Sequence, residues 1–309
     1  MTISREAVIW GYRYFLGRDP ESESVVSGNT QFPSLEDFAR TLTASDEFHL
    51  KDRMQVLFDE ARRAPATASP TASSGEMKTL RLADLPNACF LNDAARSIDG
   101  AVKLPAAAEA LLGQRLRVHF HGDVDPASLT GIALDLESIP NNLEVHFSHS
   151  NQRVRFGTAC QGQWLFRMWG ESTATIGHGV TSNETEVFLC EGGTLEIGDD
   201  CMFATVNIHV GDSHAVFDLQ TGKTLNYSPA PVVRIGTHVW LATRAVVLAD
   251  TDIGAGCVVG IASIVKGRFA PASLIVGAPA QAKRTGISWT RSHDGQGVER
   301  VSALLAPLV

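Results

Sequence analysis

A six-residue repeat of aliphatic side chains runs through residues 235–265 and restricts the folds open to this chain. Split in sixes, the segment reads IGTHVW, LATRAV, VLADTD, IGAGCV, VGIASI and V, and every unit opens on an aliphatic residue. This period matches neither a helix nor simple strand alternation; it is typical of a solenoid whose short faces turn a corner every six residues. The repeat therefore predicts a continuous interior filled by one aliphatic residue per face. The column consists of Ile235, Leu241, Val247, Ile253, Val259 and Val265.

Upstream of this segment the repeat is looser. Ile176-Gly177 and Ile197-Gly198 match the opening of the unit, but intervening positions such as Glu191 do not. We therefore expect a β-helix domain over residues 141–284, with an uncertain register before residue 210. Residues 77–140 form a β-rich entry region without a predicted fold. Within it, alternating apolar and polar residues predict a half-exposed strand at residues 116–120.

The first 62 residues have the pattern of a small helical domain. Ser4 can cap a helix whose apolar residues share one face and which ends at Gly17. Further helix starts are expected at Ser34, with Asp37 three residues later, and at Ser45. Residues 63–76, which include APATASPTASSG, have no side chain that could build a core, so a flexible linker is expected there. Residues 285–309 are left as a C-terminal tail.

Composition excludes several classes of protein. Lys and Arg number 26 against 34 Asp and Glu, a net charge of -8, and no basic cluster occurs, so a nucleic-acid partner is not expected. No apolar run approaches the roughly 18 residues of a membrane span, and the N-terminus does not resemble a signal peptide. A cytoplasmic location is therefore expected. The five cysteines form no CxxC pair, which disfavours both a disulfide framework and a thiolate zinc site.

A polar segment interrupts the repeat after Val210. It reads GDSHAVFDLQTGKTLNYSPAPV, and a solenoid can accommodate it only as a loop extruded at a corner. His214 is the one residue of this loop that can accept a proton near neutral pH, which makes it the candidate general base. Asp212 could orient its imidazole, as the third group of a triad does. Asn207 and Asp218 are alternatives for that role and, with Asn226, candidates for binding the substrate.

The ordered motifs resemble a known enzyme family. CMFATVNIHVGDSHAVFD, IGTHVWLATRAVVL, VVGIASIV and IVGAPAQAKR together resemble the sugar O-acetyltransferases of the hexapeptide-repeat family, particularly those acting on surface polysaccharides. The resemblance implies a mainly β fold, a left-handed parallel β-helix, commonly assembled as a homotrimer. FLGRDPESES at residues 15–24, followed by SDEF, resembles the small LGRxP helical domain that accompanies glycan-modifying enzymes. It implies that residues 1–62 bind or dock a protein or glycan partner; a simple cap is the alternative.

The family resemblance also implies a reaction. The loop histidine, here His214, removes a proton from an acceptor hydroxyl while that oxygen attacks the thioester of acetyl-CoA, and no metal is required. The pantetheine arm would bond to backbone groups near Ala242, Ile261 and Ala262, where this chain departs from the commoner glycine and Ala-Gly-Ser. Trp240 would pack beside the coenzyme or seal a corner. Cations near the end of the solenoid would meet its phosphates. These are Lys266, Lys283 and Arg284.

Two other functions remain open on the sequence. His178, His209 and His214 resemble the histidine ligands of carbonic anhydrases built on the same β-helix, whose zinc lies between subunits. The long loop after His214 would crowd such a metal and is better suited to a sugar. A non-catalytic scaffold is the third possibility. His119 and His121 could present one face to a metal, but solvent-facing histidines are the expectation.

Overall fold

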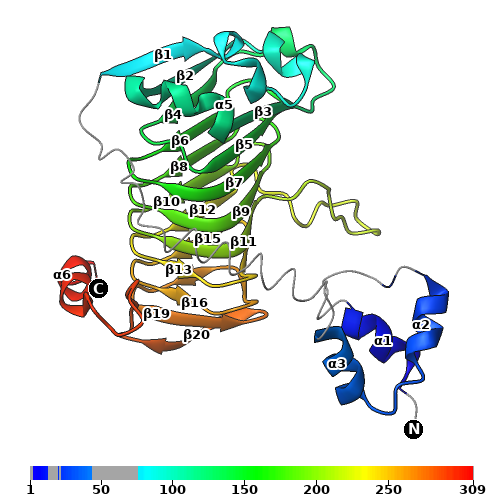
Figure 1. The fold of residues 1–309 in the computed structure, drawn as a ribbon. Coiled ribbons are helices and arrows are strands. Elements are labelled where there is room, and N and C mark those ends of the chain that lie inside the picture. The colour runs from blue at the N-terminus through cyan, green and yellow to red at the C-terminus, as the bar shows by residue number, and fades with distance from the viewer. Residues whose placement is uncertain (1–2, 13–19, 21, 44–75, 309) are drawn as a thin grey trace. The chain divides into compact units, whose positions relative to one another are not determined.

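The computed structural model describes residues 3–12, 20, 22–43 and 76–308, and the chain divides into two compact units, Met1–Pro70 and Thr71–Val309 (Figure 1). In the described part of the first unit, α1 (Arg5–Gly11), α2 (Glu23–Asn29) and α3 (Leu35–Thr43) enclose a small apolar core. None of the helices described in either unit is long and apolar enough to cross a bilayer.

Serine caps fix where these helices begin. The Ser4 hydroxyl accepts a hydrogen bond from Ala7 N, and Ser34 accepts one from Asp37 N, as the sequence predicted. The sequence reasoning missed α2, whose cap is Ser22. The helix start expected at Ser45 and the Leu-Gly-Arg motif lie outside the described residues.

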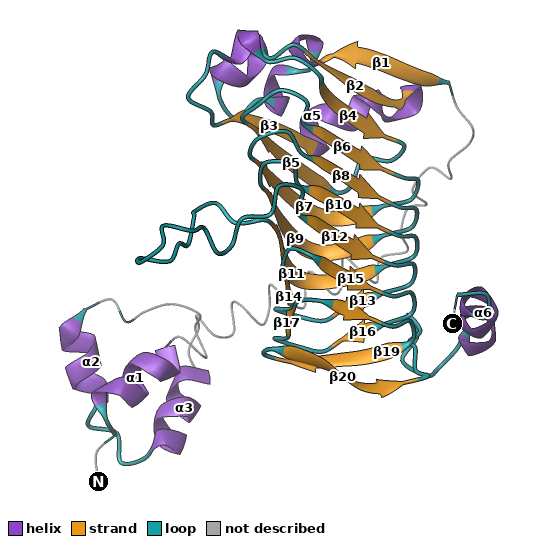
Figure 2. Cartoon of the chain, turned by 180° about the vertical axis from the view of Figure 1, so that it is seen from behind, coloured by secondary structure: helices purple, strands orange, loops and turns teal. Residues whose placement is uncertain are grey.

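The second unit is a left-handed parallel β-helix built from two long sheets (Figures 1 and 2). The first sheet has the order β1 (Met77–Arg81), β2 (Gly100–Pro105), β4 (Ile132–Leu136), β6 (Arg153–Phe156), β8 (Thr173–Ile176), β10 (Thr194–Ile197), β12 (Val232–Ile235), β15 (Thr251–Ile253) and β18 (Arg268–Phe269). The second has the order β20 (Ala280–Thr285), β19 (Ser273–Gly277), β16 (Val258–Val259), β13 (Trp240–Leu241), β11 (Met202–Val210), β9 (Thr181–Leu189), β7 (Gln161–Met168), β5 (Asn142–Phe147) and β3 (Leu116–Phe120). Two short strands branch from it, β14 (Val246–Val247) and β17 (Ile264–Val265).

Each coil has three faces because the strands of the second sheet span two of them. β11 pairs with β13 through residues 202–203 and with β14 through residues 207–208. In the coil that begins at β12, the first corner is residues 236–239, the second is 242–245 and the third is 248–250. Corners of successive coils lie in parallel register, so these three names apply to the equivalent residues of every coil.

The aliphatic column is confirmed and forms the interior. Members three units apart pair across neighbouring coils: Ile235 with Ile253, Leu241 with Val259, and Val247 with Val265. All of them are buried. The parallel ladder also reaches further upstream than the repeat indicates, because β2 already pairs with β4 at Gly100. The strand expected at residues 116–120 is β3, with alternating burial.

Antiparallel strands and helices close the two ends of the solenoid. β1 pairs antiparallel with β2 at one end, where α5 (Leu112–Arg115) also lies, and β20 pairs antiparallel with β19 at the other. Such closure protects the strand edges from pairing with another chain. The expected C-terminal tail contains α6 (Val298–Leu305), whose Val301 and Leu305 pack on Ala255.

Replacing Leu241 by Ala is expected to lower the free energy of unfolding by about 2–5 kcal/mol, because it leaves a cavity in a fully buried stack. Urea denaturation measures this change. The control is Arg234→Ala, which removes a half-exposed ion pair with Glu196 and should cost less than about 1 kcal/mol. Equal losses in both variants would contradict the role of the column.

Candidate active site

The histidine loop, residues 211–231, leaves the solenoid at a third corner. β11 ends at the buried Val210 and β12 begins at Val232, so the coil continues on both sides of the insertion. The loop projects away from the β-helix in both ribbon views (Figures 1 and 2). Its tip is solvated, with Leu219 91% exposed. The extrusion predicted from the sequence is therefore confirmed.

Asn226 braces the base of this loop. Its Nδ2 donates to Asp212 Oδ2 and to the carbonyl of His214, each at 2.9 Å. Its Oδ1 accepts a hydrogen bond from Val216 N at 2.7 Å. The amide thus ties together the two strands of the loop around His214. Asn226, which the sequence predicts to bind substrate, also holds the segment that carries the histidine.

The predicted contact between Asp212 and the His214 imidazole is not formed in the described structure. The Asp212 carboxylate instead accepts its hydrogen bond from Asn226. Asp218 lies at the loop tip, where its Oδ1 accepts hydrogen bonds from Gln220 N, Thr221 N and Thr221 Oγ1. This is the pattern of a turn-forming aspartate, so the structure gives Asp218 a local structural role.

A pocket of about 840 Å³ lies at the base of the histidine loop. His214, Asn226 and Tyr227 line it from the loop, and Lys266 lines it from a third corner further along the chain. The Lys266 ammonium donates to the carbonyl of Ala249 at 3.3 Å. Asn207 is not among the residues that line the pocket; its Nδ2 donates to Glu186 Oε2 on the neighbouring strand.

Residues of earlier coils also reach this pocket. His149, Trp169 and Cys190 line it because their third corners are in register with the loop. The sequence reasoning missed them, since the repeat is weak in these coils. Burial raises the pKa of the Cys190 thiol above its ordinary value, and the nearby Asp212 adds to this effect. The thiol is therefore protonated at neutral pH and is not a ready nucleophile.

The residues predicted to hold the donor lie at other places on the coil. Ala242 and Ala262 belong to second corners, and their amides already donate to Val259 O and Thr243 O. These two N–H groups are therefore already used within the coils, and a predicted contact of the pantetheine arm here would use other backbone groups of the second corners. Ile261, next to Ala262, is 71% exposed and presents apolar surface.

The remaining donor residues are also separated from the pocket within one chain. Trp240 lies on β13, and its ring centroid is 6.2 Å from that of Trp289 in the C-terminal tail. Lys283 and Arg284 are exposed on β20, where the Lys283 ammonium donates to Gln281 Oε1. Of the predicted donor residues, one chain places only Lys266 beside His214.

The histidines outside the loop form an unexpected cluster. His119 and His121 on β3 are half-buried, contrary to the expectation of solvent-facing side chains. His146, on β5, is the register partner of His119, and their ring centroids are 4.7 Å apart. Burial lowers the pKa of both His119 and His121. His178 lies at a first corner, away from His209 at the end of β11, and the residues the structure describes contain no group of metal-binding side chains in one chain.

The six-residue column, the three-sided parallel coils and the extruded histidine loop define a hexapeptide-repeat β-helix fold. A probable acetyltransferase of Mycobacterium tuberculosis is 35% identical over 112 residues, which are 36% of this chain and 37% of that relative. The polysialic acid O-acetyltransferase of Neisseria meningitidis is 32% identical over 79 residues, 25% of this chain and 33% of that relative. The matched segments thus span only about a third of each relative.

Among solved structures, the polysialic acid-specific acetyltransferase NeuO matches 62% of this chain and 98% of its own, with 23% identity and a TM-score of 0.48. A maltose O-acetyltransferase of Clostridium difficile matches 56% of this chain and 71% of its own, with 21% identity and a TM-score of 0.29. No protein-family model matches the chain.

Replacing Asn226 by Ala is expected to loosen the histidine loop without unfolding the β-helix, because it removes three hydrogen bonds that lie within the loop. Tryptic cleavage after Lys223 should become about 2- to 10-fold faster. The melting temperature should stay close to that of the wild type. Asp212→Asn is the control, since an amide oxygen can still accept the Asn226 hydrogen bond. Unchanged cleavage in Asn226→Ala would contradict the brace.

Proposed function

We propose that the chain is an acetyl-CoA-dependent O-acetyltransferase that modifies a sugar in surface polysaccharide biosynthesis. The pocket at the base of the histidine loop carries this proposal, because it presents His214 on a braced loop in a space large enough for a sugar. The two curated relatives are named as acetyltransferases, one of them for polysialic acid. A cytoplasmic location belongs to the same proposal, because acetyl-CoA is available there.

In the proposed reaction, His214 acts as the general base. Its imidazole takes the proton of the acceptor hydroxyl while that oxygen forms a bond to the thioester carbonyl carbon. The carbon–sulfur bond then breaks, the acetyl group remains on the sugar oxygen, and the proton passes to the leaving thiolate of coenzyme A. Because the Cys190 thiol is held protonated, direct transfer is favoured over an acyl-enzyme.

The side chains of the pocket suit the two proposed substrates. Trp169 and Tyr227 provide aromatic surface against which a sugar ring can pack, and Lys266 provides a cation for a phosphate or carboxylate. Asp212 is held by Asn226, so it stabilises the loop conformation instead of orienting the imidazole directly.

We also propose that the active unit is a homotrimer, and the three faces of the coil support this. The face of the first sheet is charged, with ion pairs such as Arg155–Glu137 and Arg234–Glu196. The other two faces meet at the second corner and carry larger apolar side chains. These are Met202, Trp240, Val258 and Leu274 on one, and Leu165, Phe188, Val246 and Ile264 on the other. The second of these two faces also carries the ion pair Arg167–Glu186.

A three-fold arrangement around the second corners would cover both apolar faces and leave the charged face in water. The face with Trp240 from one protomer would then lie opposite the face that ends at the His214 pocket of the next. The exposed Ile261 would lie near the axis. This arrangement accounts for the separation of the predicted donor residues from His214 within a single chain.

Replacing His214 by Ala is expected to lower acetyl transfer about 10²–10⁴-fold, because the acceptor hydroxyl loses its base. The measurement is release of free coenzyme A with a panel of polysaccharides that includes polysialic acid. Acetyl-CoA binding, followed by calorimetry, should persist.

His178→Ala is the matched control, since this histidine lies at a first corner and should leave transfer unchanged. Undiminished transfer by His214→Ala would remove His214 from the mechanism. Bound zinc that is lost in both variants would favour the carbonic anhydrase alternative, and a wild type without transfer to any acceptor would favour a scaffold.

Replacing Phe188 by Glu is expected to dissociate the trimer, because a charge would be buried against an apolar face. Analytical ultracentrifugation should show a monomer at concentrations where the wild type is trimeric. Arg234→Glu places the same side chain on the charged face and should leave the trimer intact. A trimer that survives in Phe188→Glu would exclude this face from the interface.

A further inference from the structure

We propose that the C-terminal strap, residues 287–291, positions Trp240 and thereby shapes the donor end of the active site. This inference rests on the function proposed above, in which Trp240 contacts acetyl-CoA. It concerns a segment for which the sequence predicted only a tail. Trp289 is the residue that carries it.

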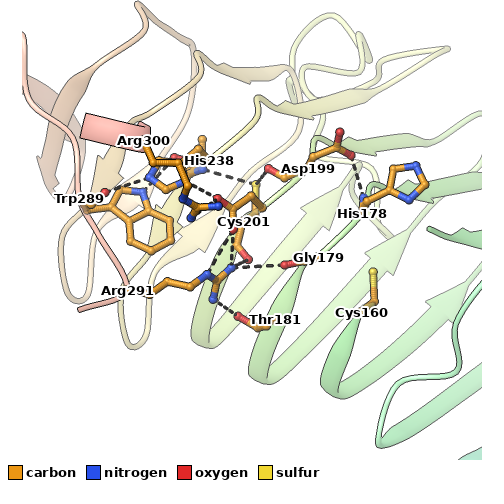
Figure 3. A network of polar contacts seen from close by, with 12 residues as sticks. Cys160, His178, Gly179, Thr181, Asp199, Cys201, His238, Trp289, Arg291 and Arg300 are labelled. Carbon is orange, nitrogen blue, oxygen red and sulfur yellow. Dashed lines mark hydrogen bonds and ion pairs between the residues drawn. The ribbon is translucent and has the colours of Figure 1, made fainter. Parts of the chain in front are cut away.

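The strap runs back along the first corners of successive coils. Ile287 N donates to Ala272 O, and Ser288 Oγ donates to Gly256 O. Further on, Trp289 meets His238, and Arg291 reaches Cys201 (Figure 3). The strap therefore ties together coils that are otherwise joined only to their immediate neighbours.

Trp289 and His238 interlock. Their rings stack with centroids 4.2 Å apart and planes 7° apart. Trp289 Nε1 donates to the His238 carbonyl, and His238 Nε2 lies 2.9 Å from the Trp289 carbonyl. His238 is 1% exposed and has a φ of 58°, a left-handed conformation that is rare for residues other than glycine. Ala159 and Asp200 have the same conformation at the equivalent corner position, so the coil itself sets the backbone, and the contacts with Trp289 fix the His238 ring.

His238 lies two residues before Trp240, at the corner that leads into β13. β13 is a strand of two residues that pairs with β11 and β16, and Trp240 N donates to Cys257 O. The Trp289 ring lies 6.2 Å from the Trp240 ring, at an angle of 50°. Trp289 is 7% exposed and Trp240 is half-buried. Trp289 therefore forms a fixed wall behind the more accessible indole.

Arg291 anchors the strap. Its guanidinium donates to Asp200 Oδ1, to Thr181 Oγ1 and to the carbonyls of Gly179 and Cys201. Asp200 Oδ2 in turn lies 2.9 Å from His238 Nδ1. One carboxylate thus joins the anchor of the strap to the histidine under Trp289. This link makes the conformation at Trp240 depend on the docked strap.

The experiment compares Trp289→Ala with Trp289→Phe in the full-length protein. Calorimetry with acetyl-CoA alone gives the dissociation constant without an acceptor. Trp289→Ala should weaken binding about 3- to 10-fold, because the wall behind Trp240 is lost. Trp289→Phe keeps an aromatic ring against His238 and should bind nearly as the wild type does. Hydrogen exchange should accelerate in residues 236–242 of Trp289→Ala and stay unchanged in residues 246–251.

Leu305→Ala is the matched control, since it loosens α6 on Ala255 without touching His238 or Trp289. It should lower the melting temperature and leave acetyl-CoA binding unchanged. If Trp289→Ala loses thermal stability but binds acetyl-CoA as the wild type does, the strap only stabilises the fold and the inference is overturned. A wild type that does not bind acetyl-CoA would overturn the proposed function and this inference with it.

Discussion

The stacking of aliphatic side chains along the solenoid axis is the constraint on which the rest of the structure depends. No single coil has a core of its own, because each face contributes only a few inward residues, such as Val233 and Ile235, whose partners lie in the coils above and below. Parallel register then follows, and with it the alignment of corners. Residues far apart in sequence, such as His149 and Lys266, reach one pocket because third corners are superimposed.

The polar chemistry of the site is carried by an element that the solenoid does not need. The coil continues on both sides of the histidine loop, through the buried Val210 before it and Val233 after it, so the coil is complete without the loop. The loop's conformation comes from its own hydrogen bonds to Asn226 and Asp218. The stability of the fold therefore comes from the interior of the coils, and the candidate site lies on a loop that its own hydrogen bonds hold in place. The loop sequence can therefore change without disturbing the interior.

The sequence alone predicted those features of the fold that depend on neighbouring residues or on the six-residue repeat. The column from Ile235 to Val265, the serine caps of α1 and α3 and the extruded loop all follow from short-range patterns. Contacts made by register between coils could not be predicted where the repeat fades, which explains why His149 and Trp169 were missed. The pairing of Asp212 with Asn226 was also beyond the sequence, because several polar residues of the loop could have satisfied that carboxylate.

The residues predicted to contact acetyl-CoA show that a family sequence pattern alone does not locate a binding site in the structure. The amides of Ala242 and Ala262 are used within the coils, and Trp240 lies on a different face from the end of β11, where the histidine loop begins. A triangular coil cannot bring two of its faces together, so a site that uses both Trp240 and His214 needs a second chain. The separation within one chain is therefore what the proposed trimer requires. In the proposed inference, Trp289 of the strap holds the Trp240 ring in place. The face that carries Trp240 would then have its final conformation before the trimer assembles.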